Sequence, residues 1–347
     1  MKRPVTIRQV ARRARVAPST VSRVLSDEGR ISEETRRRVR RALAELDYYP
    51  NSAARGLVNG ASGRLGIMLS RTAAYGDSHA LLPELLRGIG SRAARSGYDL
   101  LLASGESMLE ELSSLDRLLQ GKRVDGVVLF GSGEDDPLLD RLEESSLPFV
   151  RIGRHQFRER VPSVDTDNRL AAREAVRHLA ELGHARIGFV LGPRGLTSSW
   201  DRLEGYEQAL REIGVEPAEM WLLEGDGLSF GALRTLSLFL GQPNPPTALI
   251  VGDDRLGIFV LRTLVELRVP VPERLALVAF NSSSIADWTI PSLTSLDVGI
   301  DQIGTASVDL LLRLCEGEAP TPRSRIVPHR LVARESTLGV KPPASAP

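Results

Sequence analysis

Four polar side chains between residues 18 and 27 could make hydrogen bonds to the edges of nucleic-acid bases. They are Ser19, Ser22, Arg23 and Ser26. An arginine guanidinium can donate two hydrogen bonds to O6 and N7 of guanine, and serine hydroxyls can reach base edges or phosphate oxygens. A solvated helix face has the same composition, so the interpretation depends on the elements that carry these residues.

The four side chains belong to the second of three predicted helices. Apolar residues recur at helical spacing over residues 7–14, and Thr6 with Gln9 forms the capping-box pattern just before them. A short break leads to Pro18, which suits a first helical turn, and a third helix begins after Ser32. Two short helices joined by a tight turn, with a third closing the core, predict a helix-turn-helix unit.

The charge of the chain is divided unevenly. With 45 basic and 44 acidic residues the net charge is only +1, which alone argues against a nucleic-acid-binding protein. Residues 1–64, however, carry fifteen basic and six acidic residues, a charge of +9, and the remainder carries −8. This division indicates that one part of the chain faces a polyanion and the other part does not.

Several classes of protein are disfavoured by what the sequence lacks. The chain has one cysteine, Cys315, which we expect to be a packed side chain in a reducing compartment. No apolar segment follows the N-terminal residues as in a secretory signal, and no apolar run approaches the ~20 residues of a membrane span. The five histidines show no metal-ligand spacing, and no phosphate-binding glycine motif occurs. We therefore expect a cytoplasmic protein without cofactor, metal or membrane contact.

After residue 64 short apolar runs alternate with amphipathic segments. The predicted strands are 65–69, 99–103, 126–130, 149–152, 187–191, 220–223, 248–251 and 275–280. The predicted helices are 79–96, 108–121, 136–145, 168–182, 201–213, 229–240, 254–267 and 301–316. Regular alternation predicts an α/β domain of two doubly wound parallel-sheet lobes, with a ligand cleft at the carboxyl ends of the strands.

Short segments of the N-terminal region resemble the LacI/GalR family of bacterial transcription regulators. The matching segments are residues 6–11, 18–25, 31–36 and 49–57. In that family the recognition helix enters the major groove, which assigns base reading to Pro18, Ser19 and Arg23. The DNA contacts implied by the resemblance, with the neighbouring polar positions, are Thr6, Pro18, Ser19, Thr20, Ser22, Arg23, Ser26, Arg30, Asn51, Ala54, Arg55 and Leu57.

The resemblance also assigns a role to residues 51–58, which alone read as a linker. In the family this segment is a hinge helix that pairs with its dimer mate on DNA, and Leu57 matches the leucine that wedges into the minor groove and kinks the duplex. Two residues depart from the family pattern. Arg15 replaces the usual glycine of the turn, and Ala17 replaces the usual serine cap, so each is expected to cost roughly 1 kcal/mol of stability.

Weaker motifs extend the resemblance to the acidic part of the chain. They are residues 164–168, 182–187, 202–206 and 291–296, which resemble the family's effector domain with its type I periplasmic-binding-protein fold. We expect a DNA-binding domain at 1–60 and an effector and dimerisation domain at 61–340. Its first lobe would be 65–163 with 293–323, its second lobe 164–291 with 324–338, and 341–347 a disordered tail.

Effector-binding residues follow from the same resemblance. They are Ser70, Arg71, Arg154, Arg202, Asp253 and Asn281. Arg202 matches the arginine that anchors sugar hydroxyls or a carboxylate. Asp253 could accept hydrogen bonds from ligand hydroxyls, and the adjacent Asp254 could instead cap a helix. The family's carboxylate pair after the strand 275–280 is replaced by Asn281 and Ser282, which makes the cleft with Arg71, Arg154 and Arg202 more positive. A polyol that can be anionic, such as a sugar acid or phosphate, is therefore one hypothesis for the effector.

Together these features predict a sequence-specific transcription regulator that is not an enzyme. It would act as a repressor, bind a pseudo-palindromic DNA operator as a homodimer, and change its DNA affinity with a carbohydrate-like effector. A solute-binding protein or an α/β enzyme with a basic N-terminal segment is the alternative. The missing secretory signal opposes the first of these, and the missing catalytic constellation opposes the second.

Overall fold

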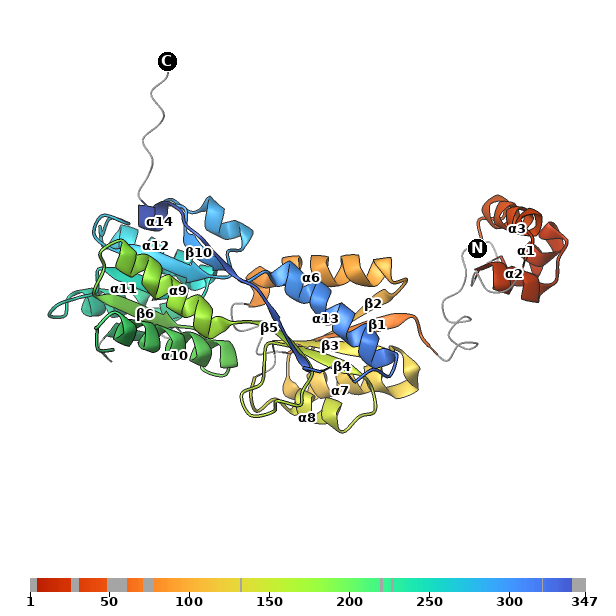
Figure 1. Cartoon of the computed structure of the whole chain (residues 1–347), viewed down its shortest axis with the longest axis horizontal. Coiled ribbons are helices and arrows are strands. Elements are labelled where there is room, and N and C mark those ends of the chain that lie inside the picture. The colour runs from red at the N-terminus through yellow and green to blue at the C-terminus, as the bar shows by residue number, and fades with distance from the viewer. Residues whose placement is uncertain are drawn as a thin grey trace, which may run out of the picture. The chain divides into compact units, whose positions relative to one another are not determined.

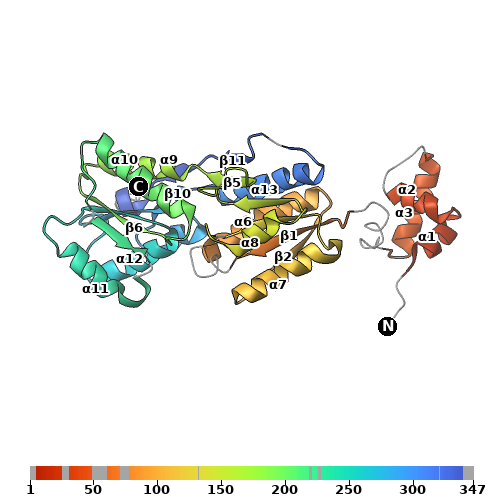
Figure 2. The same cartoon turned by 90° about the horizontal axis from the view of Figure 1, so that it is seen from below.

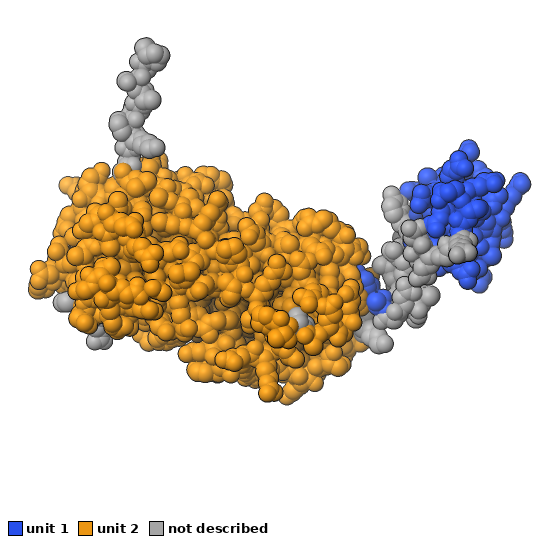
Figure 3. All heavy atoms as spheres, viewed as in Figure 1, with its two compact units in different colours: residues 1–63 blue, residues 64–347 orange. Residues whose placement is uncertain are grey.

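The computed structural model describes residues 5–25, 31–48, 61–70, 78–131, 133–218, 221–225, 228–319 and 321–338. The chain divides into two compact units, Met1–Gly63 and Arg64–Pro347, coloured separately in Figure 3. The predicted division at residues 60 and 61 lies three residues earlier. The predicted hinge helix at 51–58 and the tail at 341–347 fall outside the described residues.

The first unit contains the three predicted helices, which are α1 (Ile7–Ala14), α2 (Pro18–Leu25) and α3 (Glu33–Glu45). Their apolar faces meet in a small core of Val10, Ala11, Ala14, Val21, Val24, Val39 and Ala42. Gln9 accepts hydrogen bonds from the Thr6 backbone N–H at 2.8 Å and from the Thr6 hydroxyl at 3.0 Å, which is the reach-back half of the predicted capping box. Ser32 caps α3 through the N–H of Thr35. The helix-turn-helix prediction is confirmed for this part of the chain.

The turn between α1 and α2 contains a residue in the left-handed region. Arg15 ends α1 with φ 53° and ψ 51°, a conformation that costs a non-glycine residue roughly 1–2 kcal/mol. The side chain of Arg15 is exposed and so gains little from packing. The left-handed backbone that the expectation drawn from the missing glycine requires is therefore present, and the stability cost stays a prediction.

The second unit contains two sheets of six strands each within the described residues (Figure 1). The first sheet has the order β11-β5-β4-β3-β1-β2, with all its pairs parallel. Its strands are β1 (Arg64–Leu69), β2 (Asp99–Ala103), β3 (Gly126–Phe130), β4 (Phe149–Ile152), β5 (Ser163–Thr166) and β11 (Ser324–Val327). The helices of this lobe are α6 (Ser78–Arg95), α7 (Met108–Leu119), α8 (Pro137–Glu143) and α13 (Ile300–Cys315).

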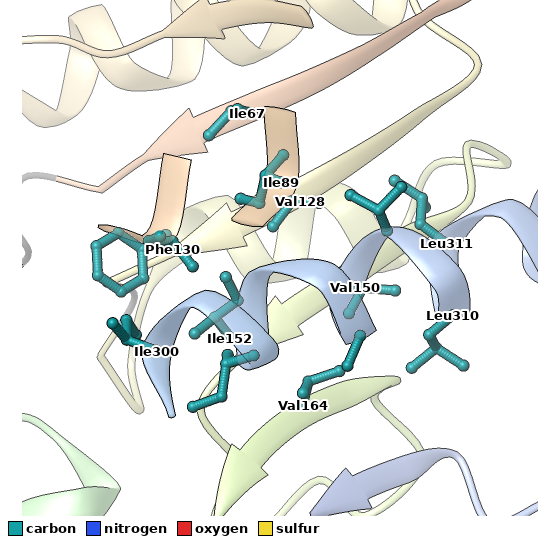
Figure 4. Packing of buried hydrophobic residues seen from close by; sticks show 14 of the residues in the cluster. Ile67, Ile89, Val128, Phe130, Val150, Ile152, Val164, Ile300, Leu310 and Leu311 are labelled. Atoms are coloured by element: carbon teal, nitrogen blue, oxygen red, sulfur yellow. The ribbon is translucent and has the colours of Figure 1, made fainter. Parts of the chain in front are cut away.

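Both faces of the first sheet are covered, as its continuous apolar strands require. Helices α6 and α13 lie on one face, and α7 and α8 lie on the other (Figure 1). Figure 4 shows Ile300 and Leu311 of α13 among Val128, Val150 and other strand residues. Cys315, at the end of α13, is partly buried, and burial raises the pKa of its thiol to about 11, as expected for a packed cysteine.

The second lobe repeats this arrangement around the sheet β12-β10-β9-β8-β6-β7. Its strands are β6 (Ile187–Leu191), β7 (Leu222–Glu224), β8 (Ala248–Val251), β9 (Ala276–Phe280), β10 (Thr294–Asp297) and β12 (Arg330–Val332). Its helices are α9 (Asn168–Glu181), α10 (Thr197–Glu212), α11 (Leu228–Leu240), α12 (Asp254–Glu266), η4 (Ser284–Trp288) and α14 (Glu335–Leu338). Helices α9 and α10 cover one face and α11 and α12 the other. Strand β12 is antiparallel to β10.

The chain passes between the lobes at three places, which are after β5, between β10 and α13, and after β11 (Figures 1 and 2). Strand β10 belongs to the second lobe, although it was expected in the first. Strands β5 and β11 belong to the first lobe, although most of β5 and all of β11 were expected in the second. These strands are only four residues long and carry polar side chains, so their partners are decided by tertiary pairing and not by a local pattern.

No helix among the described residues is long and apolar enough to cross a bilayer.

Replacing Arg15 by glycine should stabilise the first unit by about 1 kcal/mol, because glycine adopts a left-handed backbone without a steric cost. Hydrogen exchange of the α1 and α2 amides in the full chain would measure the gain as slower exchange. Arg15→Ala is the matched control, since alanine keeps the backbone cost and should leave exchange unchanged. Equal protection in all three proteins would contradict the prediction.

Candidate functional sites

The outer face of α2 presents the side chains expected to read DNA. Pro18, Ser19, Ser22 and Arg23 are exposed, whereas Thr20 is partly buried. Val21 and Val24 pack inward and fix the rotation of the helix about its axis. The helix therefore offers a guanidinium and short hydroxyls on one accessible face, a set that can contact base edges and phosphates.

The other predicted DNA contacts have different positions. Thr6 is exposed and is occupied in capping α1, which leaves its backbone near the positive end of the helix dipole. The remaining predicted contacts lie outside the described residues. They are Ser26, Arg30, Asn51, Ala54, Arg55 and Leu57.

A cleft in the second unit lies at the carboxyl ends of strands from both sheets. About 750 Å³ inside it is free of atoms, part of it open to solvent. Its lining residues are Leu81, Phe130, Gly131, Arg151, Ile152, Gly153, Arg154, Asp165, Thr166, Asn168, Leu196, Thr197, Ser198, Arg202, Asn281, Val298, Ile300 and Ile303. The aliphatic side chains come mostly from α6, α13 and the strand ends of the first lobe, and the polar ones come largely from the second lobe and from β5. The cleft thus has an apolar wall and a hydrogen-bonding wall.

Arg202 organises the hydrogen-bonding wall. Its guanidinium lies 4.2 Å from the centre of the Phe280 ring, a cation–π distance. Its Nε donates to Asn168 Oδ1 at 2.9 Å and its Nη1 to the Gly252 carbonyl at 2.6 Å. Its Nη2 lies 3.5 Å from Asn281 Oδ1. These contacts hold the guanidinium at the ends of β8 and β9, where it faces the cleft.

Asp165 and Asn168 continue this wall, and neither was predicted from the sequence as an effector contact. Asp165 accepts hydrogen bonds from the backbone N–H of Arg154 at 2.8 Å, from that of Thr166 at 2.7 Å, and from Asn168 Nδ2 at 3.1 Å. Burial raises the pKa of the Asp165 carboxyl, and the two backbone hydrogen bonds oppose that rise. Both residues lie in the segment 164–168 that resembles the family, so this segment was the feature of the sequence that could have identified them.

Arg154 lines the cleft, but its charge is already paired. Its Nε donates to Asp201 Oδ2 at 2.7 Å, and its Nη2 also bonds Asp201. This hydrogen bond to Asp201 raises the pKa of Arg154. Arg151 is buried, and Glu134 Oε1 lies 3.5 Å from its Nη2. Neither arginine offers a bare positive charge to a ligand.

Two other predicted effector residues lie away from the lining. The hydroxyl of Ser70 donates to Asp136 at 2.9 Å and is buried. Asp253 caps α12 by accepting from the Leu256 N–H at 2.8 Å, so the cap is Asp253 and not Asp254 as the sequence suggested. Asp254 instead accepts from Ser283 and Ser295. Arg71 lies outside the described residues.

The electrostatics of the lining weaken the hypothesis of an anionic effector. That hypothesis counted Arg71, Arg154 and Arg202 as positive charges. Arg154 is paired with Asp201, and Asp165 adds a carboxylate to the same lining. Asn281 and Ser282, which replace the family's carboxylates, have φ 96° and 48°. Asn281 places its amide oxygen 3.5 Å from Arg202 Nη2. The described cleft is therefore nearly balanced in charge. The described residues also contain no group of three or more metal-ligating side chains.

Comparisons with known proteins find matches in both units of the chain. Residues 6–51 match the family described as bacterial regulatory proteins, lacI family, and residues 176–337 match a periplasmic binding protein-like domain. The transcriptional regulator CelR of Thermobifida fusca is 32% identical over 337 residues, which cover 96% of this chain and 99% of the relative. The chain belongs to the lacI family. It is a DNA-binding transcription regulator, and these relatives are named as transcriptional regulators or repressors.

Two solved structures of the lacI family show the same two-lobed fold. The CelR–cellobiose complex has a TM-score of 0.72 at 31% identity and covers 96% of this chain and all of its own. A Lac repressor dimer bound to operator and an anti-inducer has a TM-score of 0.79 at 26% identity, covering 96% of this chain and 99% of its own. The predicted fold class is therefore confirmed.

Proposed function

We propose that this lacI-family protein is a repressor that binds a pseudo-palindromic operator as a homodimer and responds to a neutral carbohydrate held in the cleft. It would act in the cytoplasm, where bacterial DNA lies. The observation that carries the effector proposal is the cleft itself, which sets a charge-balanced hydrogen-bonding wall against an apolar wall. Sugar rings offer the same combination of hydroxyl edges and C–H faces. The named cellobiose complex of the relative CelR supports this class of ligand.

Arg202 is the proposed anchor of the sugar hydroxyls. Phe280, Asn168 and Asn281 hold its planar guanidinium in place. The N–H donors of a guanidinium form a fork, which binds two adjacent oxygen atoms better than an ammonium group does. Asp165 and Asn168 would complete the polar wall. Because Arg154 is paired with Asp201, a carboxylate on the ligand would find no free partner there.

Arg202→Lys should weaken binding of a neutral sugar at least about tenfold, because lysine keeps the charge but loses the planar fork. Isothermal titration of the full chain with cellobiose and other neutral oligosaccharides, and with uronic acids, would measure this. Arg211→Lys on the same helix is the matched control, since Arg211 is exposed and pairs with Glu207. Tighter binding of uronic acids than of neutral sugars would contradict the neutral-effector proposal.

DNA recognition is assigned to the exposed face of α2. Selection of DNA sequences from a random pool by the full chain should enrich two half-sites in two-fold symmetry, with centres about one helical turn apart. Deleting residues 1–63 should abolish this binding and leave sugar binding intact, because the two functions lie in separate units.

Arg23→Ala should cost about 1–3 kcal/mol on the selected site and relax its sequence preference, because a bidentate contact to a base would be lost. Competition gel shifts on selected and random DNA would measure both effects. Arg37→Ala, an exposed arginine of α3, is the control and should weaken both DNAs alike by a smaller amount. Unchanged preference in Arg23→Ala would exclude a base-reading role for this side chain.

The dimer is assigned to a side of the second unit that exposes large apolar residues. Leu100 and Leu102 are exposed on β2, an edge strand, and Trp288 and Ile290 are exposed in and after η4. Helix α6 packs beside β2, and its Glu84 lies 3.4 Å from the Ser284 N–H of η4, so these residues lie along one side of the unit. Apolar side chains gathered in this way mark association surfaces. A second copy is the occupant that a two-fold operator requires.

Leu102→Asp should shift the protein from dimer to monomer and weaken operator binding, because it places a charge in an apolar interface. Sedimentation velocity over a range of protein concentrations would detect the shift. Leu109→Asp is the matched control, because Leu109 is 80% exposed on α7, which covers the other face of the sheet. A dimer as stable as the parent in Leu102→Asp would place the interface elsewhere.

A further inference from the structure

Two side-chain contacts join the lobes where α10 begins, in addition to the three chain crossings. Glu134, in the loop after β3, accepts a hydrogen bond from the Thr197 hydroxyl. Arg154, after β4, makes a bidentate ion pair with Asp201. Glu134 and Arg154 belong to the first lobe, and Thr197 and Asp201 belong to the second. We call these four residues the clasp.

The geometry of α10 explains why the two contacts act together. Thr197 and Asp201 are four residues apart, so they lie on the same side of the helix, one turn apart. Separating the lobes at this helix would break both contacts at once. The backbones of the two lobes also lie close together at this point. A Cβ added to Gly133 would lie 3.2 Å from the Gly195 carbonyl oxygen.

The ion pair of the clasp is sheltered from water. The side chain of Asp201 is 5% exposed and that of Arg154 is 29% exposed. Bidentate pairs between arginine and a carboxylate are among the stronger hydrogen-bonded contacts, and shelter reduces their screening by salt. Asp201 also meets Arg169 Nε at 3.2 Å, a contact that lies within the second lobe.

The clasp borders the cleft, since Arg154 and Thr197 both line it. We propose that the clasp holds the two lobes closed over the cleft in the unliganded protein and controls entry to it. Arg154 is then a positioning residue that closes the site, and not a contact for the effector. The proposal for the clasp follows from the contacts between the lobes. Only the identity of the ligand that enters the cleft rests on the proposed function.

The test measures how often the cleft opens, with no ligand and no DNA. Ile303 is buried and lines the cleft from α13, so Ile303→Cys in a Cys315→Ser background places one thiol behind the clasp. Labelling of this thiol by iodoacetamide in the full chain reports opening. Asp201→Asn and Thr197→Val should each raise the labelling rate, with Asp201→Asn reaching about tenfold because it removes a charged hydrogen-bond partner.

Two matched variants separate the clasp from ordinary loss of stability. Arg169→Gln removes the ion pairs of Arg169 with Asp201 and Glu204, which both lie within the second lobe. Glu212→Gln removes the charge of the Arg173–Glu212 pair, which joins α9 and α10 in that same lobe. Both should label at the parent rate. Parent-rate labelling in Asp201→Asn and Thr197→Val would overturn the proposal. Labelling of Arg169→Gln as fast as Asp201→Asn would also overturn it, because the effect would then arise within one lobe. Neither result bears on carbohydrate binding, which titration tests separately.

Discussion

The cleft of this protein depends on how the guanidinium of Arg202 is held. One face lies on Phe280, and its donors reach Asn168, the Gly252 carbonyl and Asn281. These partners stand at the start of α9 and at the ends of β8 and β9, so one side chain draws three segments of the second lobe together. A partly buried guanidinium must keep its donors satisfied, and this requirement fixes the shape of the polar wall before a ligand arrives.

The same network extends toward the first lobe. Asn168, which accepts from Arg202, donates to Asp165 on β5, and Asp165 accepts from the backbone of Arg154. The side chain of Arg154 then returns to the second lobe through Asp201. The polar wall and the inter-lobe contact are thus parts of one continuous set of hydrogen bonds. Occupation of the cleft and separation of the lobes are therefore expected to be energetically linked.

The local sequence pattern was sufficient to predict the longer apolar elements, but it was not sufficient to predict the short polar strands. Strands β2 and β3 begin and end at the predicted residues, because continuous apolar runs bounded by polar residues leave little choice. Strands β5, β10, β11 and β12 were not among the predicted strands. They have three or four residues, and only their pairing with neighbours makes them strands. The lobe boundaries were misplaced for this reason.

The cleft shows the same limit at the level of single side chains. The resemblance assigned Arg154, Arg202 and Asn281 to effector binding, and all three line the cleft. Sequence could not reveal that Asp201 neutralises Arg154, because the two residues are 47 positions apart and meet only through the fold. It also could not decide between Asp253 and Asp254, since adjacent residues at a helix start both fit a cap until the backbone is known.

Arginine side chains have different roles in the two units, because those of the cleft are buried or partly buried and those of the first unit are exposed. In the second unit Arg151, Arg154 and Arg202 are buried or partly buried and are matched by carboxylates, carbonyls and amides, since an unmatched buried charge is costly. Counting such arginines overestimates the attraction of the cleft for an anion. In the first unit Arg8, Arg12 and Arg37 are exposed and act on their surroundings as a field. Polyanion binding therefore follows from the exposed arginines of the first unit, whereas ligand choice in the cleft follows from the geometry of donors that are already paired.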